Sequence, residues 1–178
     1  AFTGLRFNFR DSQVQRITGV NFTLWRPHKD NKDSVVTGLS LGVIPGGGRV
    51  RGISVGLLGA GADSELIGLT VAGLGAGAGE SVKGVCIALA GVGAGDNITG
   101  VAIGGLGAGA GENAKGLVVG GLGVGAGEDL AGIAFGGLGV GAGEDITGLA
   151  IGGMAVGAGE DMTGLMFGSL ATGCGENL

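Results

Sequence analysis

Glycine recurs in this chain at a fixed interval of sixteen residues, from Gly52 to Gly164, without a single insertion. Each of these glycines opens the same phrase, of which residues 132–147 are one copy: Gly-Ile-Ala-Phe-Gly-Gly-Leu-Gly-Val-Gly-Ala-Gly-Glu-Asp-Ile-Thr. Three less regular copies of 15, 19 and 14 residues come first and open at Gly4, Gly19 and Gly38. Eleven copies thus cover residues 4–178, and such a period indicates a repeat architecture with one structural unit per copy.

Alternation inside each copy predicts strands. Counting the opening glycine as position one, positions two and four carry aliphatic side chains or phenylalanine, as in Ile133 and Phe135. Positions seven, nine and eleven form a second apolar alternation, as in Leu138, Val140 and Ala142, and position fifteen is apolar again. A period of two is typical of β-strands, so each copy is expected to hold two short strands. Paired glycines form the corner between these strands, and acidic or amide side chains at positions thirteen and fourteen form the other corner.

Two short strands cannot bury their apolar side chains alone, but stacked copies can. We therefore predict an all-β fold, a parallel β-solenoid (β-helix) of about eleven coils with a rise of about 4.8 Å per coil. Identical copies stacked in parallel place leucine on leucine and glutamate on glutamate, which accounts for the constant repeat length. The alternative is an antiparallel β-meander in which the paired glycines are hairpin turns. A helical fold is not expected, because each glycine inside a helix costs about 1 kcal/mol.

The chain divides by regularity and by charge. Residues 1–51 carry eight basic and three acidic groups, a net charge of +5, and contain five of the seven aromatic residues. Residues 52–178 carry two basic and twelve acidic groups, a net charge of −10, so the whole chain is at −5. We predict irregular N-terminal coils over residues 1–51, with a capping role and a basic loop, followed by a regular sixteen-residue solenoid over residues 52–178.

Composition excludes several classes of protein. Of 178 residues 47 are glycine, yet glycine does not recur at every third position as in collagen. A hydrophobic content of 44% with 14% charged residues is too apolar for a disordered chain. One histidine and two cysteines leave little scope for a metal or nucleophile site, so neither an enzyme nor a cofactor is expected. The net negative charge argues against nucleic acid as a partner, and no small-molecule substrate is expected.

Two regions are candidates for contact with a protein partner. The first is a basic segment in the longest insertion, with Trp25, Arg26, His28 and Lys29, because long loops often carry contacts. The second is a ladder of glycines at positions eight, ten and twelve, which would face away from the apolar positions. Glycine within strands suggests either tight curvature or the close approach of another surface, and both interpretations stay open. The docking candidates of this ladder are Gly107, Gly109, Gly123, Gly125, Gly139 and Gly141.

Position thirteen forms an acidic column that runs along the regular copies. Stacked carboxylates about 5 Å apart repel each other unless water, salt or a hard cation screens them. The first interpretation is a solvated edge that keeps the chain soluble. The alternative is a calcium site, for which the candidates are Glu112, Glu128, Asp129, Glu144 and Asp145.

The recurring Gly-aliphatic-x-aliphatic-Gly pattern with variable polar corners resembles the glycine-rich surface-repeat proteins of bacterial envelopes. This resemblance covers nearly the whole chain and implies a β-solenoid-like fold. In size and general build, the chain is also similar to the extrinsic structural subunits of bacterial reaction-centre and light-harvesting complexes. That second similarity implies a non-catalytic clamp that holds pigment-protein subunits together without pigment ligands of its own.

Two functions follow as hypotheses. The first is a non-enzymatic scaffold or clamp subunit of a larger membrane-associated complex, such as a photosynthetic reaction-centre and antenna assembly. Its partners would be the protein subunits of that complex, with the membrane surface as a further candidate. The second is a bacterial cell-surface module that binds cations or extracellular ligands through the acidic edge. Because the chain starts at Ala1, as after removal of a signal peptide, we expect an exported protein of the periplasm or cell envelope, extrinsic to the membrane.

Overall fold

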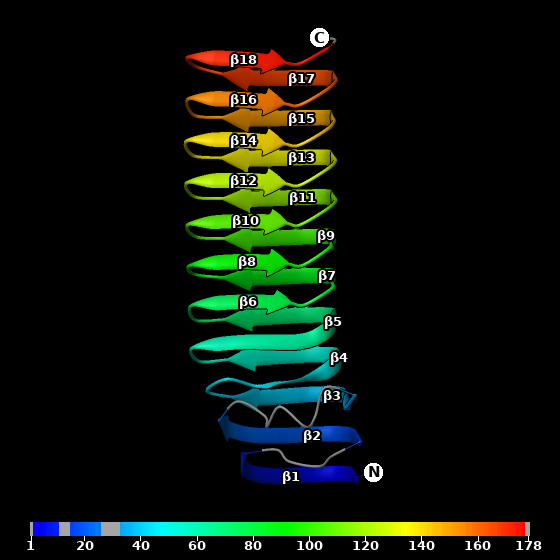
Figure 1. The fold of residues 1–178 in the computed structure, drawn as a ribbon. Helices are drawn as coiled ribbons and strands as arrows, with labels where there is room; N and C mark the ends of the chain where they lie inside the picture. The colour runs from blue at the N-terminus through cyan, green and yellow to red at the C-terminus, as the bar shows by residue number, and fades with distance from the viewer. Residues whose placement is uncertain (1, 11–14, 26–32, 177–178) are drawn as a thin grey trace.

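The computed structural model describes residues 2–10, 15–25 and 33–176 and shows an all-β parallel solenoid (Figure 1). Each regular coil holds one long and one short strand, and the two ends of the chain lie at opposite ends of the stack (Figure 1). Eleven long strands stack on one another and form the long-strand sheet. They are β1 (Phe2–Arg10), β2 (Arg16–Trp25), β3 (Val35–Gly42), β4 (Gly46–Gly56), β5 (Gly59–Ala72), β7 (Ser81–Ala88), β9 (Asn97–Gly104), β11 (Ala114–Gly120), β13 (Leu130–Gly136), β15 (Ile146–Gly152) and β17 (Met162–Gly168).

The shorter strands stack separately and form the short-strand sheet. It begins with the first residues of β4 and β5, where Gly46 pairs with Gly61 and Gly59 pairs with Gly75, and continues through strands of four residues each. These strands are β6 (Gly75–Ala78), β8 (Gly91–Ala94), β10 (Gly107–Ala110), β12 (Gly123–Ala126), β14 (Gly139–Ala142), β16 (Ala155–Ala158) and β18 (Ala171–Cys174). The two sheets are therefore the two walls of one thin solenoid.

All pairings between successive coils are parallel, and those between the regular coils join equal positions of the repeat. Gly116 of β11, for example, pairs with Gly100 of β9 on one side and with Gly132 of β13 on the other. The parallel stack with sixteen-residue spacing is thus confirmed, and the antiparallel meander is wrong. The irregular first copies join the same ladder, because Gly4 pairs with Gly19 and Gly19 with Gly38. The register between β4 and β5 shifts between Gly47 and Arg49, where the shorter copy meets the regular ones.

The interior of the solenoid is lined by positions three, nine and fifteen, with small residues at position eleven packed against them. In one coil these interior residues are Leu130, Ala134 and Val140, which are at most 4% exposed. The apolar side chains at positions two and four, such as Ile133 and Phe135, point outward instead. The alternation in the sequence correctly predicts both strands. However, the side chain that enters the core between positions two and four is the smaller one at position three.

The alternation continues through the opening glycine. All eleven opening glycines have a φ between +112° and +126°. Successive side chains of a strand point to opposite faces, and this pattern is the same on both sides of Gly132. Leu130 and Ala134 point inward, whereas Ala131 and Ile133 point outward. The gap between the two walls then accommodates mainly alanine, valine and cysteine at position three of the middle coils.

Candidate functional site

The outer surface of the long-strand sheet carries two apolar columns along the whole stack, flanked by an exposed column at position sixteen that includes Thr99, Lys115 and Thr147. We call the two apolar columns the apolar sheet face and define it as the side chains at positions two and four of all eleven copies, from Leu5 and Phe7 to Leu165 and Phe167. None of these side chains is charged or can form a hydrogen bond. Monomeric soluble proteins rarely expose continuous apolar patches of more than a few hundred Å², so this surface is a candidate contact site.

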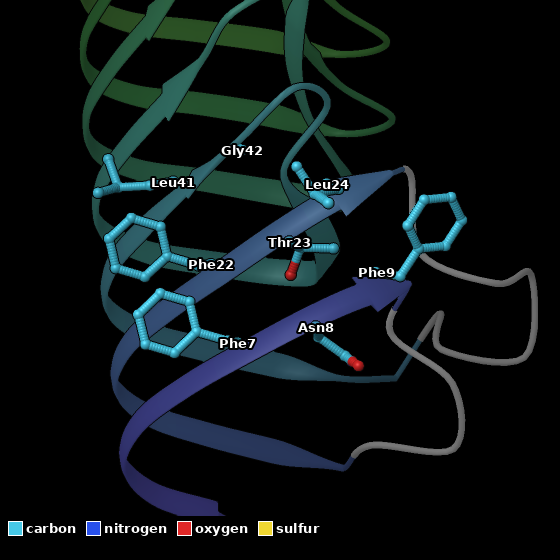
Figure 2. Close-up of a pocket in the computed structure, with 8 residues that line it drawn as sticks. All are labelled: Phe7, Asn8, Phe9, Phe22, Thr23, Leu24, Leu41 and Gly42. Carbon is cyan, nitrogen blue, oxygen red and sulfur yellow. The ribbon is translucent and has the colours of Figure 1, made fainter.

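An aromatic cavity continues the apolar sheet face at its N-terminal end (Figure 2). The rings of Phe7 and Phe22 stack with their centroids 4.8 Å apart and their planes inclined by 9°. Phe7 and Phe9 are about seven-tenths exposed. The cavity has a volume of about 430 Å³, and its lining consists of Phe7, Asn8, Phe9, Phe22, Thr23, Leu24, Leu41 and Gly42.

The basic segment that the sequence predicts as a docking loop follows this cavity in the chain. Trp25 is the last residue of β2, and its side chain lies outside the described part of the structure. Arg26, His28 and Lys29 also lie outside the described residues. Their part in docking stays a prediction.

One corner of the solenoid carries a row of apolar side chains, mostly exposed leucines, which we call the leucine ridge. It consists of the position-seven side chains of the regular coils, which are leucine except for Ala90 and Met154. Leu106, Leu122 and Leu138 are 57%, 52% and 51% exposed. Although position seven continues the alternation of positions nine and eleven, it precedes the short strand and lies at the turn. Sequence reasoning grouped these leucines with the apolar strand positions and so missed their exposure.

The six docking glycines lie in β10, β12 and β14, on the short-strand sheet, and are half-buried. None of them has a positive φ. A Cβ at Gly107 would lie 3.4 Å from the carbonyl oxygen of Gly123, and a Cβ at Gly125 would lie 4.0 Å from that of Gly141. The equivalents of Gly107 in the last two coils are alanines, Ala155 and Ala171. A Cβ at Gly109 would lie 3.2 Å from the carbonyl oxygen of Gly125, a tighter contact. Backbone geometry therefore does not require glycine at position eight but leaves less room at position ten, and docking through this wall stays a prediction.

The acidic column lies at the corner opposite the leucine ridge. Asn113 donates a hydrogen bond from Nδ2 to Oε2 of Glu128 at 3.3 Å, and the backbone N–H of Asp161 donates to Oδ1 of Asp145 at 3.0 Å. Desolvation raises the pKa of the Glu144 carboxyl, and the neighbouring acidic groups raise it further, Glu128 first. The raised pKa of Glu144 therefore reflects repulsion between the stacked carboxylates of the acidic column.

The calcium candidates are glutamates of this acidic column and the aspartates that follow them at position fourteen. They are Glu112, Glu128, Asp129, Glu144 and Asp145. Within residues 2–10, 15–25 and 33–176, the structure brings together no group of three or more His, Cys, Asp or Glu side chains that could hold a metal ion. Calcium binding therefore stays a prediction without a preformed cluster of ligands among the described residues.

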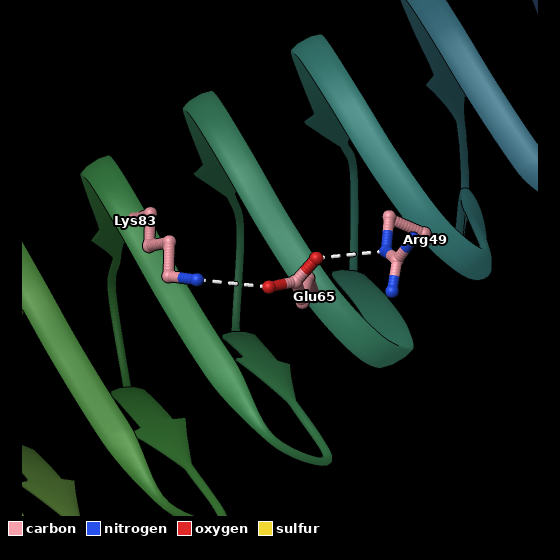
Figure 3. A network of polar contacts seen from close by, with 3 residues as sticks. All are labelled: Arg49, Glu65 and Lys83. Atoms are coloured by element: carbon pink, nitrogen blue, oxygen red, sulfur yellow. Dashed lines mark hydrogen bonds and ion pairs between the residues drawn. The ribbon is translucent and has the colours of Figure 1, made fainter.

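A small polar network lies at the start of the regular coils (Figure 3). Arg49 Nε is 2.7 Å from Glu65 Oε2, and Lys83 donates a hydrogen bond from Nζ to Glu65 Oε1 at 2.8 Å. The hydrogen bond from Lys83 lowers the pKa of the Glu65 carboxyl, partial desolvation opposes it, and the positive charges of Lys83, Arg49 and Arg51 reinforce the lowering. These contacts join three successive coils of the stack.

No helix among the described residues is long and apolar enough to cross a membrane. The arrangement offers a long apolar wall, an aromatic cavity at one end of it, a leucine ridge and an acidic corner.

Comparison of the chain with protein-family models, with curated proteins and with solved structures finds no match.

Proposed function

We propose that this protein is a non-enzymatic structural scaffold, which docks on a larger membrane-associated protein assembly through its apolar sheet face. The observation that carries the proposal is the apolar sheet face itself, which extends over eleven strands without a charged side chain. A rigid wall of this kind can hold several protein surfaces at fixed spacing, because each coil contacts only its neighbours and the stack extends in one direction.

The chemistry of the apolar sheet face favours a protein as its partner. Interfaces between proteins are enriched in aromatic side chains, which supply large and rigid contact areas. Phenylalanine occupies position four near both ends of the wall, as Phe7 and Phe22 and as Phe135 and Phe167. The aromatic cavity adds a concave site into which a side chain of the partner could insert. We therefore place the anchors of the interface at these phenylalanines.

The proposal includes the location and the class of partner. The protein would be exported to the periplasm or cell envelope and lie outside the bilayer core. A pigment-protein assembly of a reaction centre and its antenna is the partner class that the similarity in size and build implies. In such an assembly this chain would act as a clamp and would not ligate pigments.

The test combines native purification with crosslinking from defined positions. A photoreactive phenylalanine analogue at Phe135 should crosslink to subunits that co-purify in stoichiometric amount in mild detergent, whereas the same analogue at Glu128 should not. The triple variant Val119→Lys, Phe135→Lys and Ile151→Lys should lose the assembly, because burial of an unpaired charge at an interface is costly. The control variant Asn113→Lys and Glu144→Lys, which adds the same charge at the acidic corner, should retain it.

Retention of the assembly by the apolar-face variant would contradict docking through this wall. Recovery of the native chain as a free monomer shed into the medium would favour the second hypothesis, a cell-surface module that uses its acidic edge.

A further inference from the structure

Polar side chains are confined to one corner of the solenoid in the five regular coils that span residues 84–163. In these coils, positions one to twelve contain no charged, amide or hydroxyl side chain. All such side chains lie at positions thirteen, fourteen and sixteen, around the turn that leads from a short strand to the next long strand. The leucine ridge lies at the opposite turn, for example between β9 and β10 (Figure 1). The cross-section of the solenoid is therefore amphipathic, with an acidic corner and a leucine corner.

The backbone N–H groups at the leucine corner are paired along the stack. The N–H of Leu122 donates to the carbonyl oxygen of Leu106, and the N–H of Leu138 donates to that of Leu122, both at 2.6 Å. The glycine N–H groups before these leucines are paired as well, with Gly121 donating to Gly104 at 3.1 Å. Hydrocarbon offers no hydrogen-bonding partner, so backbone can enter it only where its polar groups are satisfied internally. The carbonyl oxygens of Gly105 and Gly121 accept none of these bonds, so the corner can enter a bilayer only as far as the headgroup region, where water reaches them.

From these two observations we propose that the leucine ridge inserts into the surface of a lipid bilayer, with the acidic corner directed toward water. The half-exposed leucines would enter the boundary between headgroups and acyl chains, as the apolar face of an interfacial amphipathic helix does. Successive leucines are about 4.8 Å apart, so the ridge forms a continuous apolar line parallel to the membrane. This contact does not depend on the protein assembly proposed above, because it uses a different surface.

The composition of the leucine ridge favours lipid over the other possible occupants. Protein interfaces carry a polar rim and are anchored by aromatic or arginine side chains, and neither occurs between Leu106 and Leu138 along this corner. A second copy of the chain is disfavoured by shape, because two convex corners touch along a line, while stable interfaces bury about 800 Å² per partner. Fluid acyl chains need neither polar partners nor a complementary shape.

Vesicle flotation tests the assignment directly with the full chain and phosphatidylcholine vesicles. The ridge variant Leu106→Gln, Leu122→Gln and Leu138→Gln should partition roughly a hundredfold less, at about fivefold per leucine from the apolar area that is no longer transferred. The matched control, Glu112→Gln, Glu128→Gln and Glu144→Gln at the opposite corner, should bind at least as well as the native chain. A sheet-face variant, Ile103→Gln and Val119→Gln, should also retain binding.

A second measurement keeps the test decisive if the ridge variant fails to fold. In a Cys174→Ala background, a fluorophore attached to Leu122→Cys should be quenched by nitroxide-labelled acyl chains, while one at Asn113→Cys should be quenched by iodide in the water. Equal iodide quenching at both positions in the presence of vesicles would overturn the proposal. So would loss of binding in the sheet-face variant with retention in the ridge variant, or a dimer in light scattering that the ridge variant abolishes. Vesicles contain no protein, so these results leave the proposed docking on a protein assembly untouched.

Discussion

Gly116 shows at the scale of one residue why glycine recurs every sixteen positions. Its φ is +118°, and a Cβ added there would overlap the carbonyl oxygen of Gly100 in the preceding coil. We expect Gly116→Ala to lower the free energy of unfolding by about 1–3 kcal/mol, the cost of holding an alanine in a backbone region that glycine alone adopts readily. The shift of the urea midpoint measures this loss.

Gly123 supplies the matched control for that substitution. A Cβ at Gly123 would lie 3.5 Å from the carbonyl oxygen of Gly139, an ordinary contact, and its φ is not positive. Gly123→Ala should therefore change the free energy of unfolding by less than about 0.5 kcal/mol. Equal losses in the two variants would mean that the opening glycine has no special conformational role.

The two cysteines differ in environment and should differ in reactivity. Cys86 is fully buried at position three, and desolvation raises the pKa of its thiol to about 12. Cys174 lies in the last short strand and is half-buried. Since the thiolate is the reactive form, iodoacetamide at pH 8 should modify Cys174 in the native protein and leave Cys86 unmodified. Mass spectrometry of tryptic peptides measures the extent of modification at each cysteine. As a control, both cysteines should react in guanidinium. Rapid labelling of Cys86 in the native protein would contradict its buried position.

At the scale of the structural element, the acidic corner and the polar network respond to pH in opposite directions. Glu144 has a raised pKa in the folded state, so its ionised form destabilises the stack, and this cost disappears as the pH falls through the folded pKa toward 4.5. Glu144→Gln should therefore stabilise the protein at pH 7. The gain should shrink in 1 M salt, which screens Glu128 and Glu160, and at acidic pH. Urea midpoints as a function of pH measure it.

Glu65 is the counterpart with the opposite sign. Its pKa is lowered chiefly by the hydrogen bond from Lys83, so it contributes stability above pH 4.5 that is lost as the pH falls through its folded pKa. Glu65→Gln should cost less than about 1 kcal/mol at pH 7, because the basic partners Arg49 and Lys83 are largely exposed. The difference from the native chain should vanish at acidic pH. A stabilising Glu65→Gln at pH 7 would show that the network does not join the coils.

For the whole molecule, constant repeat length makes a coil the unit of deletion. Removal of residues 116–131 joins Lys115 to Gly132, so equal positions of the remaining copies can still stack on one another. The shortened chain should fold, with a maximum dimension in X-ray scattering smaller by about 4.8 Å. Its urea midpoint should fall only modestly, since the stability of a repeat array is close to a sum over repeats and their interfaces.

Removal of residues 116–130 is the control, because it leaves one extra residue inside a long strand. That residue displaces the opening glycine from the stack of opening glycines. It also turns side chains that should point inward to the outer face of the strand. This shorter deletion should destabilise the protein more than removal of the full coil. If both deletions were tolerated equally, in-register stacking would not be what holds the coils together.

Sequence alone was sufficient for the strands and the acidic corner, and it favoured the parallel in-register stack over an antiparallel meander. In a parallel stack of copies of equal length, Glu112, Glu128 and Glu144 lie directly above one another, and the structure has that arrangement. A polar corner at positions thirteen and fourteen is readable from sequence because charged side chains avoid a thin apolar interior. What could not be read is which apolar residues lie inside.

Three-dimensional packing settled the placement of the apolar residues, for a physical reason. In the long strands, both parities of the alternation are apolar, for example Ile133 and Phe135 on one side and Ala134 on the other, so hydrophobicity does not distinguish the walls. The choice depends on a narrow gap that accommodates Ala134 but not Phe135. This gap arises only when neighbouring coils and opposite strands come together, and it creates the apolar sheet face and the leucine ridge.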